Sequence, residues 1–179
     1  SFTNQSFALN PGLEKTFPWL SQIASNYEEY ELVQCLFTYR STTSEQGTTN
    51  SGQVGTVIMA TQYNPSKADW DSKQIMMGYD AAGSGKATAD QVHGVECDNG
   101  KLSGTDEKYV RSGPVVDDLK NYDHGKFQVA ISNSPSAFEN QSLGELWVSY
   151  TVTLRNPKLY TGRGFAISQD LFVQTAPVL

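Results

Sequence analysis

The sequence has few cysteines, no long apolar run and no leader-like start. Cys35 and Cys97 are the only cysteines among 179 residues, too few for a disulfide framework of the secreted kind, so two free thiols are expected. No apolar run approaches the roughly 20 residues that a membrane helix needs. No charged, apolar and small-residue signal peptide opens the chain. These absences predict a soluble protein with no membrane partner.

Positive charge is scarce as well. The chain has 13 Lys and Arg against 19 Asp and Glu, with a formal net charge of −6 and a pI near 4.8. Gripping nucleic acid over a broad face depends on clustered Lys and Arg, so the composition argues against that kind of binding by this chain. A local phosphate contact stays open at the basic stretch formed by Arg155, Lys158 and Arg163.

Alternation of apolar and polar residues is the strongest signal present. In residues 144–154 every second residue is apolar, and the same period returns in 31–41 and 127–131. This is the mark of strands with one buried face. Residues 54–63 are also rich in β formers until Asn64-Pro65 stops the run. Shorter strands are expected within residues 1–9, one or two within 75–97, and one at 109–110.

Helical signals are short. Pro18 opens a stretch in which Trp19, Ile23 and Tyr27 recur every four residues, which predicts one short helix. For Trp19 a place in the core is favoured over a contact between subunits. Helical turns are also expected within 68–76 and 114–121. Helices this short cannot bridge parallel strands. The sequence therefore predicts a single all-β domain of two packed antiparallel sheets, with loops 42–52 and 81–89 on exposed surfaces.

Motifs for nucleotide binding and hydrolysis are weak. Gly83-Ser84-Gly85-Lys86 resembles part of a phosphate loop but lacks the earlier Gly and the following Ser or Thr, so a flexible loop is the favoured interpretation. His93 and His124 are the only histidines, and no Gly-x-Ser-x-Gly elbow accompanies them. A hydrolase would need one of them beside a Ser and an acid in space. We expect no enzyme.

Carboxylates offer the candidate metal site. Asp69 and Asp71 follow the predicted strand that ends at Tyr63, and Asp117-Asp118 lie near a turn. Calcium favours such oxygen ligands. The alternative is that these are ordinary solvated loop acids. Zinc is not expected, because the histidines and cysteines show no close pairing.

Five blocks, in order, carry a resemblance to a known family. They are FPWLSQIA (17–24), YEEYE (27–31), FTYRS (37–41), GTVIMATQYNP (55–65) and residues 144–154. In this combination the chain resembles tombusvirus-type coat proteins, and among them most of all the capsid proteins of small circular single-stranded DNA viruses.

The resemblance implies a fold and a function. The fold is an eight-stranded antiparallel jelly-roll sandwich with one to three short helices. Residues 1–157 would form the shell domain, and residues 158–179 a tail packed on the shell or a neighbouring subunit. Identical subunits would assemble into an icosahedral shell in the virion, around a viral genome held mainly by a basic N-terminal arm outside this chain. The host receptor is not predicted.

The resemblance also bears on calcium, and one rival function stays open. Relatives among plant RNA viruses often carry Asp-x-Asp after the block ending at Tyr63, where it binds calcium between subunits. Here Gln62-Tyr63-Asn64 stands there instead, so Asp69 and Asp71 could serve only if their loop faces a neighbour. The rival is a carbohydrate-binding jelly roll, in which exposed Trp70 and Trp147 would stack on sugars.

Overall fold

Eight strands and three short helical elements make up the described part of the chain. The computed structural model describes residues 2–44, 54–98, 100, 102, 104–136 and 141–159. In chain order the elements are β1 (Phe2–Ala8), α1 (Leu20–Ala24), β2 (Tyr27–Ser41), β3 (Thr56–Gln62), α2 (Lys73–Met77), β4 (Gly83–Lys86), β5 (Gln91–Gly94), β6 (Lys108–Tyr109), the 3-10 helix η2 (Leu119–Asn121), β7 (Lys126–Ser132) and β8 (Gly144–Pro157). The predicted all-β class is confirmed.

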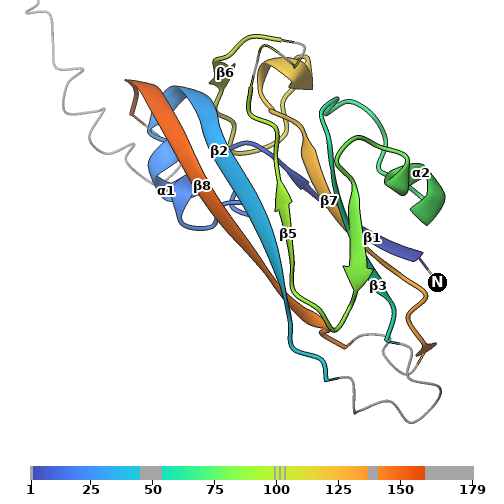
Figure 1. The fold of residues 1–179 in the computed structure, drawn as a ribbon. Helices are drawn as coiled ribbons and strands as arrows, with labels where there is room; N and C mark the ends of the chain where they lie inside the picture. The colour runs from blue at the N-terminus through green and yellow to red at the C-terminus, as the bar shows by residue number, and fades with distance from the viewer. Residues whose placement is uncertain are drawn as a thin grey trace, which may run out of the picture.

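The strands form two antiparallel sheets packed face to face (Figure 1). One sheet has the order β1-β7-β3-β4. In the other, β2 is central: it pairs along its length with β8 on one side, and with β5 and β6 on the other. Helix α2 lies beside the first sheet, and α1 lies near the end of β2 and β8 (Figure 1). This is the two-layer sandwich that the alternation predicted.

A β-bulge interrupts the alternation of β2. The register against β8 shifts between Leu32 and Gln34, so one residue is inserted into the strand. Tyr30 and Leu32 before the bulge are buried, while Val33 is 50% exposed. An unbroken alternation over residues 31–41, as the sequence predicts, would place Val33 on the same buried face as Cys35; that is wrong at this position, because the extra residue turns the side chain of Val33 outward.

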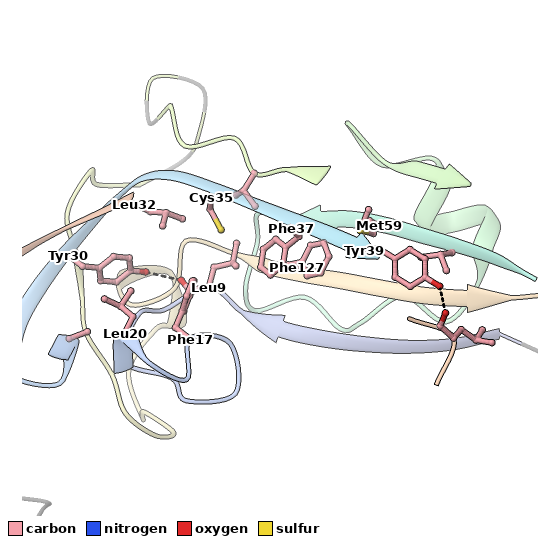
Figure 2. Close-up of a cluster of buried hydrophobic side chains, with 14 of the residues drawn as sticks. Leu9, Phe17, Leu20, Tyr30, Leu32, Cys35, Phe37, Tyr39, Met59 and Phe127 are labelled. Atoms are coloured by element: carbon pink, nitrogen blue, oxygen red, sulfur yellow. Dashed lines mark hydrogen bonds between the residues drawn. The ribbon is translucent and has the colours of Figure 1, made fainter. Parts of the chain in front are cut away.

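Aromatic side chains fill the space between the sheets (Figure 2). The rings of Phe37 from β2 and Phe127 from β7 stack with centroids 3.7 Å apart and planes 2° apart. Strand β3 is buried on both faces, because its outward Ile58 and Ala60 pack in a second cluster with Trp70 and with Met76 of α2. Burial on both sides explains the continuous apolar run of this strand.

Two further expectations fail locally. Helix α1 buries Leu20 and Ala24, while Trp19 is 66% exposed, so the core prediction for Trp19 is wrong. Residues 83–86 form strand β4, paired with β3, and not a flexible loop. None of the helices among the described residues has the length and apolarity needed to span a bilayer.

Candidate functional site

The two histidines lie in the protein interior. His93 is buried, and its Nε2 lies 2.8 Å from the Thr61 hydroxyl. His124 is also buried, with its Nε2 2.7 Å from the backbone carbonyl of Glu96. Burial lowers the pKa of both imidazoles, since the charged form is poorly solvated there. These hydrogen bonds join the two rings to a threonine hydroxyl and a backbone carbonyl, and not to the serine and carboxylate partners that a hydrolase triad requires.

Asp69, which lies between β3 and α2, is held by a lysine from strand β7. Its Oδ1 accepts a hydrogen bond at 2.6 Å from the Nζ of Lys126, the first residue of β7, and this amine also bonds to the Lys67 carbonyl. Partial burial alone would raise the pKa of Asp69, but the contact with Lys126 outweighs it and the pKa is lowered. An ammonium group therefore already satisfies this carboxylate within one chain.

The other candidate acids are not gathered around a common centre. Asp71 is exposed. Asp117 accepts a hydrogen bond from the hydroxyl of Tyr122 at 3.3 Å, and Asp118 caps η2 through the amide of Lys120 at 3.1 Å. Within the residues that the structure describes, no group of three or more His, Cys, Asp or Glu side chains could hold a metal ion. A calcium site at Asp69 and Asp71 would need ligands from a second subunit.

The predicted phosphate contact is largely neutralised. Arg155 forms ion pairs with Glu31 on β2 and with Glu107, and Lys158 pairs with Glu28 at 3.0 Å. Arg163, the third basic candidate, lies outside the described residues. The described part of this stretch thus presents paired charges, which attract phosphate less than free cations do.

The two tryptophans proposed for sugar stacking differ in exposure. Trp70 is 8% exposed and packs edge-on against Tyr79, so it is not available to a ligand, and that part of the prediction is wrong. Trp147 on β8 is 53% exposed, as its outward position predicted. Its indole Nε1 donates to Glu145 at 3.1 Å, and the guanidinium of Arg40 lies 5.2 Å from its ring centroid.

A buried polar network fixes the loops at one end of the sandwich. Asp123 receives two hydrogen bonds of 2.7 Å from the guanidinium of Arg111. Asn10 is fully buried and donates to the backbone carbonyls of Tyr109 at 3.0 Å and Tyr122 at 2.8 Å. Its Oδ1 accepts from the Arg111 amide at 3.1 Å. Asn10 begins an Asn-Pro-Gly stretch, which is typical of a turn, but no local spacing identifies the distant partners of its side chain.

Two tyrosines tie loops to the central strand at both ends of the molecule. The hydroxyl of Tyr30 lies 2.6 Å from the Tyr122 carbonyl, and the hydroxyl of Tyr39 lies 2.7 Å from Ala87 O and 3.0 Å from Leu143 O. Burial raises the pKa of both phenols, most strongly that of Tyr30. Loops fixed in this way present a rigid surface, which reduces the ordering cost of binding a partner.

The comparisons with known proteins agree with this geometry. A family model described as "Viral coat protein (S domain)" matches residues 1–159. The capsid protein of Oat chlorotic stunt virus is 28% identical over 163 residues, covering 88% of this chain and 33% of that protein. The chain therefore belongs to the viral coat protein S-domain family.

Solved virus structures share the fold. The X-ray structure of Melon necrotic spot virus aligns with a TM-score of 0.73 at 23% identity, over 89% of this chain and 51% of that one. Tobacco necrosis virus aligns with a TM-score of 0.74 at 15% identity, over 90% of this chain and 89% of that one. The chain spans about a third of the curated relative and about half of the Melon necrotic spot virus chain.

Proposed function

We propose that this chain is the shell domain of a viral capsid protein, which assembles with identical copies into an icosahedral shell enclosing the viral genome. The single observation that carries the proposal is the coat-protein family match over residues 1–159. The two-sheet sandwich of the described residues supports it. On this proposal the protein resides in the virion, and its role is structural and not enzymatic.

Assembly would rest on many modest interfaces repeated by symmetry. Aromatic and other large apolar side chains are enriched at the centres of protein–protein interfaces. Trp19 and Ile23 at α1 supply such groups at one place on the surface, with exposed fractions of 66% and 39%. The loops fixed by Asn10 and Tyr39 would hold their shape as neighbours dock. These features support subunit contacts at the ends and edges of the sandwich.

The genome is proposed to be held mainly by residues outside the described range. The net charge of −6, and the ion pairs that Arg155 and Lys158 form with glutamates, weaken the attraction of this part of the chain for phosphate. A basic arm preceding the domain would supply that attraction. A particular kinship with the capsid proteins of small circular single-stranded DNA viruses stays a prediction. The relatives reported above carry the names of plant viruses and do not test it. Nuclease treatment of nucleic acid from purified particles would identify DNA or RNA.

Calcium binding at Asp69 and Asp71 is proposed only for the assembled shell, where a neighbouring subunit could supply further ligands. Titration of particles and of free subunits with calcium tests it, with Asp71→Asn as the variant. Binding by particles that the variant loses supports a site between subunits. Equal or absent binding in both states contradicts it, and the contacts of Asp69 within its own chain, such as the ion pair with Lys126, would then account for that residue.

The proposed function is tested by expressing the protein, with any residues that precede Ser1 in its natural sequence, and examining it by size-exclusion chromatography and negative-stain electron microscopy. We expect closed particles of uniform diameter. A monodisperse monomer at every concentration and ionic strength would contradict the proposal. A glycan array addresses the carbohydrate-binding alternative, which the burial of Trp70 weakens.

A further inference from the structure

A cavity lies at the end of the sandwich where β3 ends and β7 begins. Its volume is about 230 Å³, and its walls include residues 63–65 after β3, Lys108 of β6, Lys120 of η2, and residues 123–124 before β7. A water molecule takes up about 30 Å³ in the liquid. The cavity therefore has room for a small ligand together with a few of its water molecules.

Lys108 brings a buried positive charge to this cavity. The residue is 7% exposed, and its Nζ donates to the Lys120 carbonyl at 2.7 Å. An ammonium group has three N–H donors, and this is the one hydrogen bond that the Nζ makes within the part of the chain that the structure describes. Burial lowers the pKa of Lys108, while the charge of Asp123 acts in the opposite direction. A buried charge with donors to spare favours an anionic partner.

The carboxylate in the cavity wall already has a cation of its own. Asp123 lines the cavity, but its two oxygens accept hydrogen bonds of 2.7 Å from the guanidinium of Arg111. Lys120, which is exposed, adds a second ammonium group to the lining. The charges of Arg111 and Asp123 cancel formally, so those of the two lysines remain. This end of an otherwise acidic chain therefore attracts anions.

Other titratable groups near the cavity do not reverse this sign. Burial raises the pKa of the Tyr63 hydroxyl, and the carboxylates of Glu96 and Asp80 raise it further, so both acids lie near that side of the cavity. Neither is among its described lining residues. Burial lowers the pKa of His124, and its Nε2 donates to the Glu96 carbonyl at 2.7 Å, so this ring is neutral at pH 7. The charge in direct contact with the cavity is that of the two lysines.

We propose that this cavity binds a small oxyanion, a phosphate or carboxylate group, through the ammonium groups of Lys108 and Lys120. Anionic oxygens accept strong, charge-assisted hydrogen bonds from an ammonium group. Lysine acts as a point charge and does not select between the two kinds of oxyanion by shape. Such a group comes either from a free anion or from a carboxylate side chain of a second copy of this chain. The second source rests on the proposed capsid function, and the first does not.

Titration of the full chain with inorganic phosphate, at constant ionic strength and followed by NMR, tests the site. We expect saturable shifts of the Lys108 and His124 signals. Lys108→Met should weaken binding about tenfold or more, and Lys120→Met, which keeps the carbonyl that holds Lys108, should weaken it severalfold. Lys67→Met is the matched control, because Lys67 is exposed and outside the described lining, and it should change nothing.

Several results would overturn the proposal. These are shifts that are absent or do not saturate, and equal weakening by the lysine variants inside and outside the cavity, which would indicate general charge attraction alone. Thermal unfolding of each variant checks that it is folded. If Lys108→Met does not fold, the comparison of Lys120→Met with Lys67→Met decides, and equal affinities of these two variants would contradict the site.

Particles and free subunits separate the two sources. Phosphate that binds both with the same affinity indicates a free anion. Phosphate that binds free subunits but is excluded from particles indicates that a carboxylate of a neighbouring copy takes the site, and Lys120→Met should then weaken assembly while Lys67→Met does not. If no particles form, the titration of the subunit still decides whether the cavity binds an anion. Failure of the proposed function is thus distinguishable from failure of this inference.

Discussion

The ion pair between Arg111 and Asp123 gives the most specific test of how the sandwich is held together. The side chains are 12% and 1% exposed, and two hydrogen bonds of 2.7 Å join them. Asp123→Asn removes the charge but keeps the shape, so the guanidinium of Arg111 is left buried without its anion. Removing one partner of a buried pair costs about 3–5 kcal/mol. We expect a loss of about 3 kcal/mol, since Arg111 retains some contact with solvent.

Urea denaturation followed by tryptophan fluorescence measures this loss. For a domain of this size the change corresponds to a melting temperature lower by roughly 6–12 °C. Asp117→Asn is the matched control, because Asp117 lies in the same segment but is exposed, and it should change stability by no more than about 0.5 kcal/mol. Replacing both partners by apolar residues, Arg111→Met with Asp123→Leu, should recover much of the stability. If Asp123→Asn costs no more than Asp117→Asn, the network is not a stabilising element.

Three further predictions concern the core. Phe127→Ala removes a ring stacked at 3.7 Å on Phe37, and calorimetry should show a loss of about 3–5 kcal/mol; a loss below about 1 kcal/mol would contradict the packing described. Burial lowers the folded-state pKa of His93 and His124 below the unfolded value of about 6.5. The unfolded state then takes up protons first on acidification, so stability should be constant above that pH and fall below it. His93→Gln with His124→Gln should flatten this dependence in urea titrations at pH 7.5 and 5.0, and an unchanged slope would refute it. Burial raises the pKa of the Cys35 thiol to about 12, so alkylation at pH 8 should be slow until the protein unfolds, and rapid labelling in the native state would be the contrary result.

Sequence patterns predicted a strand well where one of its faces packs on the core and the other faces solvent. The alternation in residues 144–154 corresponds residue for residue to the half-buried and exposed positions of β8. It failed at Val33, because a bulge is set by pairing with a partner strand and leaves no mark in the alternation. It also failed at Trp19, because the helix is turned by one residue relative to the face that the four-residue spacing suggested. In α1 it is Leu20 and Ala24 that are buried.

The contacts of the candidate sites could be predicted less well. Asp69 and Lys126 lie 57 residues apart, and Asn10 and Asp123 lie 113 apart. Pairs at such separations are brought together by the order of strands in the sheet. No local spacing specifies them, so the sequence identified Asp69 as a candidate ligand but not the ammonium group that satisfies it. The five blocks of resemblance predicted the coat-protein family. They did not predict any of these long-range contacts.

A cryo-electron microscopy reconstruction of the purified protein, expressed with any residues that precede Ser1 in its natural sequence, tests the proposed shell function most directly. We expect closed icosahedral particles in which the sandwich of β1 to β8 fits the density at every symmetry-related position. Particles whose shell density does not accommodate this sandwich, or a protein that stays a single subunit under all conditions, would contradict it.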